Sequence, residues 1–322
     1  MKHWMFLAAA AALATSGLAA GAAHAECKLM RIQEWTVRLE RNLPVIDGQI
    51  NGQKIAILVD SGSERSFVTR SAAARLMLTR YDASAKGLYT IPADRPVEAV
   101  QVDELKIGAA TRKNWSVGLA AAQDFGSDIA LVLGEDFLSA TDVEFDLPNR
   151  AIRLFDARDC QSVSLAYWAK GGAGEAALES GSRTMFTVTV NGRPLQATFD
   201  TGTTVSALTM PAAARLGMTP QSPGVVPAGC STGVGRQPVD YWSGPFERFA
   251  IGDEIISNPR LRFGDVFKSA APMAALPQMV LGMDFLRTHR AYVARTQKKL
   301  YFTYSGGTVF PSDAAKDCRD LR

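Results

Sequence analysis

The chain contains one stretch of sequence twice, and this duplication limits the folds that it can adopt. The first copy, "INGQKIAILVDSGS" (Ile50–Ser63), matches "VNGRPLQATFDTGT" (Val190–Thr203) at an offset of 140 positions. A second pair, "LVLGEDFL" (Leu131–Leu138) and "MVLGMDFL" (Met279–Leu286), matches at an offset of 148 positions. Because a solenoid needs more than two units, the pattern predicts one domain that is present in two copies.

Each copy has the pattern of a β-rich lobe with one or two short helices. A short apolar run follows each Asn-Gly turn and predicts a strand that ends at Asp60 in the first copy and at Asp200 in the second. The segment "AAARL" occurs in both copies and predicts a helix that begins at Ser71 or at Pro211. The aspartate of each "DFL" segment is expected to cap a further helix.

A stretch rich in Gly, Ala and Ser, Lys170–Ser182, separates the two copies and is typical of a linker or surface loop. We therefore expect a mainly β protein with two similar lobes. The N-terminal lobe is predicted at residues 26–165, the linker at 166–182 and the C-terminal lobe at 183–322.

Residues 1–25 have the features of a signal peptide. Lys2 begins a polar start, "WMFLAAAAALA" is an apolar stretch, and "AHA" before Glu26 is a small-x-small cleavage site. The apolar run is too short for a membrane anchor, and no other stretch is long and apolar enough to span a membrane. We expect cleavage near Ala25 and export of the mature chain to the periplasm or the medium.

Four cysteines remain after this cleavage, and an oxidising compartment predicts that they form two disulfides. The four are Cys27, Cys160, Cys230 and Cys318. Three pairings are possible, and the sequence does not choose among them. Since no two of these cysteines have CxxC spacing, a zinc site is not expected.

The composition excludes several kinds of chemistry. Only His289 remains after removal of the signal segment, so a zinc site with two histidines is impossible and a catalytic triad would depend on this residue alone. It lies in the charged stretch "RTHR" and is expected at the surface. The net charge of +3 without a basic run argues against nucleic acid as a partner. We expect neither a metal nor another cofactor.

The repeated Asp-[Ser/Thr]-Gly-[Ser/Thr] motif has a chemical logic. The strand before the motif fixes the position of the aspartate, and the glycine allows backbone N–H groups to approach the carboxylate. Twofold pseudosymmetry would bring Asp60 and Asp200 together, and two carboxylates a few ångströms apart share one proton. Such a pair can hydrolyse peptides with neither histidine nor metal.

These residues also carry a family resemblance. "DSGSERSFVTRSAAARLML" resembles the active-site segment of retropepsin-type aspartic proteases, particularly the retrotransposon kind, and "DTGTT" followed by "AAARLGM" resembles the same segment. "LVLG" and "MVLG" resemble the apolar-apolar-Gly element that packs under the active-site loop of that family. A chain with both motifs is similar to a fused dimer in the manner of pepsin. The resemblance implies a monomer of two β-barrel lobes with the active site in the cleft between them.

The resemblance assigns roles to residues of both copies. Asp60 and Asp200 would be the catalytic pair. The supporting residues are Ser61 and Thr201 for a hydroxyl network across the lobes, Gly62 and Gly202 for backbone N–H groups at the carboxylates, Ser63 and Thr203 for hydroxyl donors to the outer carboxylate oxygens, and Gly134 and Gly282 for the segment beneath. Because donors to a carboxylate lower its pKa, the hydroxyl donors predict an acidic activity optimum.

The remaining parts of such a site are weakly marked in this sequence. Gly87, Gly233 and Gly235 lie at plausible distances after the two aspartates for flap tips. Three aromatic residues are candidates either for the substrate groove or for the core: Tyr89, Tyr241 and Trp242. Glu64 and Arg65, which follow the first motif, are expected to be a solvated pair.

The sequence supports one leading hypothesis and one alternative. The leading hypothesis is an exported aspartic endopeptidase that binds an extended peptide between its lobes. The alternative is a catalytically inactive peptide-binding protein on the same scaffold, since a fold alone does not prove chemistry. Whether the segment before Leu43 masks the cleft as a propeptide stays open at this point.

Overall fold

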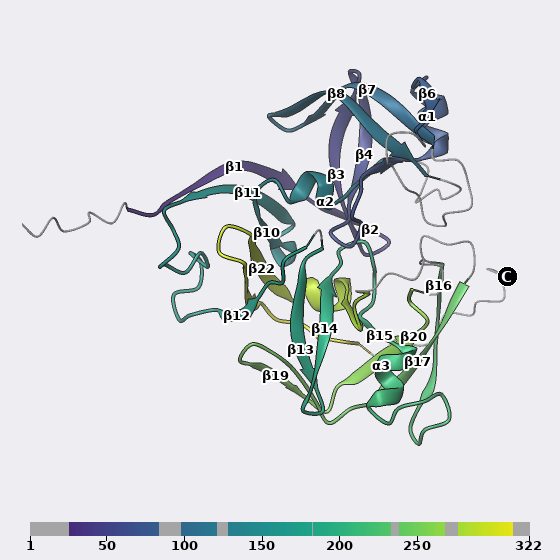
Figure 1. The fold of residues 1–322 in the computed structure, drawn as a ribbon, viewed down its shortest axis with the longest axis vertical. Helices are drawn as coiled ribbons and strands as arrows, with labels where there is room; N and C mark the ends of the chain where they lie inside the picture. Colours follow the sequence, from purple (N-terminus) through teal and green to yellow (C-terminus); the bar gives the residue numbers. More distant parts are fainter. Residues whose placement is uncertain are drawn as a thin grey trace, which may run out of the picture.

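The structure of the chain is a computed structural model. The structure describes residues 26–83, 98–120, 128–181, 183–232, 238–267 and 276–311. The predicted signal peptide lies outside these residues. The fold is mainly β with a few short helices, as the sequence predicts, and within the described residues the strands form three sheets. Figure 1 shows one lobe above the other, with the third sheet on the left beside both.

The first lobe is built on an eight-stranded sheet. In spatial order its strands are β2 (Arg38–Glu40), β3 (Leu43–Ile50), β4 (Gln53–Val59), β9 (Ile129–Leu133), β5 (Phe67–Val68), β8 (Ala110–Leu119), β7 (Glu98–Ile107) and β6 (Arg80–Asp82). Strand β9 lies between β4, to which it is parallel, and β5, to which it is antiparallel. This arrangement places the end of β4 beside the end of β9.

The second lobe repeats this arrangement in a nine-stranded sheet. In spatial order its strands are β16 (Val226–Thr232), β17 (Pro238–Pro245), β20 (Arg260–Gly264), β15 (Ala207–Thr209), β21 (Met279–Leu281), β14 (Arg193–Phe199), β13 (Met185–Val190), β18 (Arg248–Ile251) and β19 (Glu254–Ser257). Strand β21 is parallel to β14 and antiparallel to β15, as β9 is to β4 and β5. The sequence duplication is therefore a duplication of structure.

The Asn-Gly pairs explain why both copies fold locally in the same way. Asn51 and Gly52 join β3 to β4 with φ angles of 49° and 79°, and Asn191 and Gly192 join β13 to β14 with 48° and 77°. Two successive residues with positive φ make the tight hairpin turn that Asn-Gly favours. This turn fixes the register of each hairpin, and with it the residue at which the second strand ends.

The third sheet has six strands and joins the lobes. In spatial order they are β1 (Lys28–Thr36), β11 (Ala151–Arg158), β10 (Asp142–Asp146), β22 (His289–Ala294), β23 (Lys299–Tyr304) and β12 (Gly174–Ala177). Strand β10 of the first copy pairs directly with β22 of the second. Because strands of both copies share one ladder, the two lobes are tied through continuous backbone hydrogen bonds.

The segment before Leu43 belongs to this framework. Strand β1 pairs along its length with β11, and a disulfide between Cys27 and Cys160 fastens its start. The sequence allows three ways to pair the four cysteines, and this bond belongs to one of them. Cys318 lies outside the described residues, so a second disulfide between it and Cys230 stays a prediction.

The helices begin at other residues than the sequence predicts. Helices α1 (Arg70–Arg75) and α3 (Met210–Arg215) are capped by the side chains of Thr69 and Thr209, which accept from backbone N–H groups. Helices α2 (Glu135–Leu138) and α4 (Met283–Leu286) have glycine at the N-cap and no side-chain cap. The aspartates of the two "DFL" segments are therefore not caps.

His289 is fully buried, and the expectation of a surface histidine is wrong. Its ring stacks on Phe285 with centroids 3.9 Å apart, and its Nε2 lies 2.9 Å from a carboxylate oxygen of Glu254. The side chain of Arg290, its charged neighbour in β22, points to the other face of the sheet because a strand alternates its side chains between two faces.

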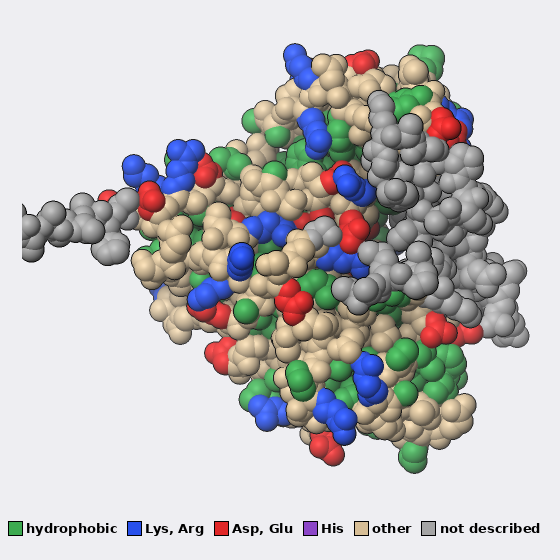
Figure 2. All heavy atoms as spheres, in the orientation of Figure 1, with side chains coloured by type: hydrophobic (Ala, Val, Ile, Leu, Met, Phe, Trp, Pro, Cys, Tyr) green, Lys and Arg blue, Asp and Glu red, His purple; other side chains and the backbone are tan. Residues whose placement is uncertain are grey.

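On the face of the molecule in Figure 2, Lys and Arg are interspersed with Asp and Glu. No helix among the described residues is long and apolar enough to cross a membrane.

Candidate active site

Each motif aspartate stands at the end of a buried strand. Asp60 follows β4, and its backbone N–H donates to the carbonyl oxygen of Leu133 in β9 at 2.9 Å. Asp200 follows β14, and its backbone N–H donates to the carbonyl oxygen of Leu281 in β21 at 3.0 Å. The last bond of each parallel ladder therefore fixes the backbone from which the carboxyl group projects.

The residues after the two aspartates bind each other across the lobes. The Ser61 N–H donates to the Thr201 hydroxyl at 3.0 Å, and the Thr201 N–H donates to the Ser61 hydroxyl at 3.1 Å. The Ser61 hydroxyl then donates to the Phe199 carbonyl at 3.0 Å, and the Thr201 hydroxyl to the Val59 carbonyl at 2.7 Å. Both side chains are buried. Four reciprocal hydrogen bonds in a dry interface hold the two loops rigidly together.

The glycine of each motif lies against the carboxyl group of the other. A Cβ atom added to Gly62 would lie 2.1 Å from the Cγ of Asp200, and one added to Gly202 would lie 2.3 Å from the Cγ of Asp60. These separations are far inside van der Waals contact, so only glycine allows this approach. The two carboxyl groups lie close enough for each to influence the pKa of the other. The structure therefore brings both aspartates to one point near the pseudo-twofold axis.

Backbone N–H groups, and not hydroxyls, surround the carboxylates. The N–H groups of Gly62 and Ser63 both donate to Oδ1 of Asp60 at 3.0 Å, and the Gly202 N–H donates to Oδ1 of Asp200 at 2.8 Å. The predicted hydroxyl donors of the two motifs point elsewhere. The Ser63 hydroxyl donates to the Arg65 carbonyl at 2.8 Å, and the equivalent threonine hydroxyl donates to the Val205 carbonyl at 3.4 Å.

The electrostatics of the pair differ from the expectation based on those hydroxyls. Burial raises the pKa of Asp60 well above its usual value, and repulsion from Asp200 raises it further, while the N–H groups of Gly62 and Ser63 oppose the change. Burial also raises the pKa of Asp200. The prediction of lowered pKa values is therefore wrong, because desolvation and repulsion outweigh the backbone donors. A pair of this kind retains one shared proton over a wide pH range.

Each active-site loop ends in a serine that the sequence reasoning missed and that binds the element beneath the loop. In the first lobe, the Ser66 hydroxyl accepts from the Gly134 N–H at 2.9 Å and donates to Asp136 at 2.6 Å. In the second lobe, Ser206 makes the same bonds to Gly282 and Asp284, at 2.9 Å and 2.5 Å. The two serines are 140 positions apart, so the offset of the duplication was a signal that could have found them.

The two glycines of this element pack directly under the active-site loops. A Cβ added to Gly134 would lie 2.7 Å from the carbonyl oxygen of Ser63, and one added to Gly282 would lie 2.6 Å from that of Val205. The backbone after each glycine also binds the loop, because the N–H of Glu135 donates to the Ser63 carbonyl at 2.8 Å. The element therefore supports the loop from below in both lobes.

Other predicted residues have mixed outcomes. Glu64 does not form a solvated pair with Arg65, because its carboxylate accepts a hydrogen bond from Arg183 of the second lobe at 2.9 Å. Tyr241 is buried beside Asp200, and Trp242 stacks on Phe263 with centroids 6.2 Å apart. The candidate flap residues Gly87, Gly233 and Gly235 and the aromatic Tyr89 lie outside the described residues. Within the part of the chain that is described, no group of three His, Cys, Asp or Glu side chains could hold a metal ion.

Comparison with known families agrees with this geometry. Residues 46–140 match the family model described as gag-polyprotein putative aspartyl protease, and residues 186–285 match the model described as aspartyl protease. No curated protein matches the chain. The fold and the paired motifs thus define a chain with two aspartyl-protease domains in tandem. One match covers Asp60 and the other covers Asp200, and together they are consistent with a retropepsin-like protease in duplicated form.

Proposed function

We propose that the protein is an exported aspartic endopeptidase in which Asp60 and Asp200 are the catalytic pair. The observation that carries the proposal is the mutual approach of the two carboxyl groups, each against the glycine of the opposite motif. The reciprocal bonds between Ser61 and Thr201 support it, because they hold both loops in place without a ligand. Preorganisation of this kind is what a site needs to stabilise charge that develops during reaction.

The chemistry follows from one shared proton. The ionised aspartate takes a proton from a water molecule, whose oxygen forms a bond to the carbonyl carbon of the scissile peptide. The protonated aspartate donates its proton to the carbonyl oxygen. When the tetrahedral intermediate collapses, the C–N bond breaks, the leaving nitrogen takes the first proton, and the second returns to its aspartate. No cofactor is needed, and the substrate is a peptide in an extended conformation.

The pH dependence follows from the directions of the pKa shifts. The active form carries one proton on the pair, so its range begins at the lower pKa and ends at the higher one. Because burial raises the pKa of Asp60 and that of Asp200, this range lies above that of two free carboxyl groups. We expect a mildly acidic optimum, and a rate that falls on both sides of it.

Export of the chain rests on separate observations. The disulfide between Cys27 and Cys160 supports an oxidising compartment. We propose that residues 1–25 are removed near Ala25 and that the mature protein acts as a monomer in the periplasm or the medium, with domain boundaries as the sequence predicts. N-terminal sequencing of the exported protein tests the cleavage site, and a mature chain that still begins with Met1 would contradict it.

A peptide-library digest tests the proposed activity. The wild-type protein, Asp60→Asn and Asp159→Asn are compared at several pH values, with a statine-type inhibitor in a parallel series. Asp159 is exposed and has a φ of 56°, which asparagine also adopts, so it is a matched control. We expect Asp60→Asn to lower kcat by about 10²- to 10⁴-fold or more, and Asp159→Asn to retain activity.

Two results would contradict the proposal in different ways. Full activity of Asp60→Asn would exclude the assigned mechanism. A wild-type protein that binds the inhibitor and library peptides but cleaves none at any pH would instead indicate a peptide-binding protein on the same scaffold.

A further inference from the structure

The segment just before β13 contacts both the active-site loop of the first lobe and the Gly134 element beneath that loop. Arg183 donates from its Nε atom to Glu64 at 2.9 Å, and Glu64 lies in the loop that begins at Asp60. Thr184, the next residue, donates its hydroxyl to Glu135 at 3.0 Å, directly after Gly134. Two neighbouring residues of the second lobe therefore hold the active-site loop and the element beneath it.

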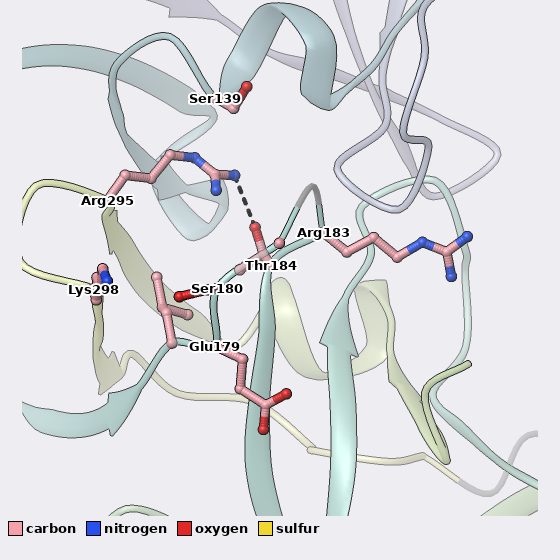
Figure 3. Close-up of a pocket in the computed structure, with 9 residues that line it drawn as sticks. Ser139, Glu179, Ser180, Arg183, Thr184, Arg295 and Lys298 are labelled. Carbon is pink, nitrogen blue, oxygen red and sulfur yellow. Dashed lines mark hydrogen bonds between the residues drawn. The ribbon is translucent and has the colours of Figure 1, made fainter. Parts of the chain in front are cut away.

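Figure 3 shows that these side chains point in different directions. Arg183, Thr184 and Arg295 all border a pocket of about 330 Å³. The guanidinium of Arg183 points away from Lys298 and Arg295, whereas Arg295 turns toward Thr184 and donates to its hydroxyl at 3.0 Å. Arg295 also pairs with Glu135, of which only 2 % is exposed. The charge of Arg183 is thus directed out of the pocket, and its partner is the first-lobe loop.

This arrangement breaks the symmetry of the duplicated chain. At the offset of 140 positions, Arg183 corresponds to Leu43 and Glu64 corresponds to Thr204. Neither Leu43 nor Thr204 carries a charge, so the second-lobe loop has no matching ion pair. The cation is attached to the lobe of Asp200, and its anionic partner is attached to the loop of Asp60. The two carboxyl groups therefore lie in unequal electrostatic environments.

We propose that Arg183 is a positioning residue that makes the pair asymmetric, with Asp200 held as the ionised member and Asp60 as the protonated one. The assignment of roles in hydrolysis rests on the proposed function. Asp200 then takes the proton from water, and Asp60 donates to the carbonyl oxygen.

The charges around the pair support this direction. Arg183 lowers the pKa of Asp200 against the larger effect of burial, whereas the pKa of Asp60 is raised by burial and by its neighbour Asp200. Tyr241 faces Asp200 from β17, but burial raises its pKa to about 12, so it is neutral at any pH at which the pair titrates. Arg262 of β20 lies 3.5 Å from Asp284 and is partly neutralised there. Among the described residues, Arg183 is thus the cation that distinguishes the two sides.

The direct test is a titration of the aspartate side-chain carboxyl carbons by carbon-13 NMR, which needs no catalytic activity. The full protein, Arg183→Gln, Arg183→Lys and the exposed control Arg193→Gln are compared. In the wild type we expect Asp200 to titrate at lower pH than Asp60. Arg183→Gln is expected to raise the titration of Asp200 by about one pH unit, the lower end of the effect of an adjacent arginine. Arg183→Lys and Arg193→Gln are expected to keep the wild-type value.

A second variant keeps the test decisive if Arg183→Gln fails to fold. Glu64→Gln removes the counter-charge and leaves the cation, so it is expected to move the titration of Asp200 in the opposite direction, to lower pH. The proposal is overturned if Asp60 titrates first in the wild type. It is also overturned if Asp200 is unmoved by Arg183→Gln or moves upward in Glu64→Gln.

Activity supplies an independent readout. In Arg183→Gln the acidic limb of the pH profile of kcat/KM should move to higher pH by the same amount as the NMR titration of Asp200. If Arg183 had a purely structural role, its replacement would instead lower the rate equally at every pH. A protein that shows the predicted titrations but hydrolyses no peptide would refute the proposed function and leave the asymmetry intact. If the protein hydrolyses peptides and the pH profile is unchanged in Arg183→Gln, the asymmetry is refuted and the proposed function is left intact.

Discussion

Replacement of Gly62 by alanine places a methyl group where the structure has no space for one. The added Cβ would lie 2.1 Å from the Cγ of Asp200, whereas carbon atoms in contact lie about 3.5–4.0 Å apart. The Asp200 carboxyl group or the loop of Gly62 must therefore move by roughly 1.5–2 Å. Since Ser61 and Thr201 fix the loop through four hydrogen bonds, we expect most of the displacement to fall on the carboxyl group.

Both stability and activity should respond to this displacement. Overpacking in a dense region costs about 1–3 kcal/mol of unfolding free energy. A misplacement of about 1 Å at a reacting group costs about 10²-fold in rate, so kcat/KM should fall by at least about 10²-fold. The two quantities are measured by urea unfolding and by cleavage of a peptide substrate at the optimal pH.

Gly118 is the matched control for this variant. Its added Cβ would meet its nearest atoms at 3.7 Å and 3.8 Å, which is ordinary contact, and it lies in a strand of the same lobe. Gly118→Ala should therefore keep stability and kcat/KM close to those of the wild type. If Gly62→Ala behaves like Gly118→Ala, the close approach of the two motifs is not present in solution and the geometric reasoning fails.

Three further predictions concern stability. Because the folded state raises the pKa of Asp60, the folded protein gains stability as pH falls through that raised value and loses it as pH rises. Asp60→Asn should therefore have a higher Tm than the wild type at neutral pH, and the difference in Tm should shrink on acidification. A difference in Tm that does not change with pH would contradict a buried charge at Asp60. Glu135→Ala leaves the guanidinium of Arg295, which is 20 % exposed, without its carboxylate partner, and should lower the unfolding free energy measured in urea by about 3 kcal/mol. An unfolding free energy equal to that of the wild type within error would show that the pair is not formed. Joint replacement of Cys27 and Cys160 by serine opens a bridge with a sequence separation of 133 and should cost about 2–5 kcal/mol by the same assay, and equal stability with and without reductant in the wild type would refute this.

Local features of the fold could be predicted from the sequence because short-range physics determines them. Asn51-Gly52 and Asn191-Gly192 form the predicted turns, since positive φ at two successive positions suits these residues. The strand that follows each turn ends one residue before the predicted aspartate. The duplication then supplied the long-range information that one copy lacks, because two equal units tend to pack about a twofold axis.

The remaining features depend on contacts between residues far apart in the chain. The pairing of β10 with β22 joins segments that no local pattern connects. Glu64 resembled a solvated charge because Arg183, its partner, arrives from the other lobe. His289 resembled a surface residue because its local stretch is charged, whereas its ring packs between Phe285 and Glu254.

The sequence also does not determine which atom of Ser63 donates a hydrogen bond to Asp60. The sequence correctly indicated a donor near the Asp60 carboxylate but not which atom donates. The backbone N–H of Ser63 takes that role, and the hydroxyl turns to the Arg65 carbonyl, because the loop curls back on itself. Burial and repulsion from Asp200 outweigh this donor and reverse the expected direction of the pKa shift of Asp60.

The central claim is that Asp60 and Asp200 act as one catalytic unit, and a double-mutant cycle in kinetics tests it most directly. The kcat values of Asp60→Asn, Asp200→Asn and the doubly substituted protein are measured on one peptide substrate at the optimal pH. Residues that act as a unit are strongly non-additive, so we expect each single variant to lose about as much activity as the double variant. Losses that multiply in the double variant, or a single variant that keeps substantial activity, would show that the two carboxyl groups work separately.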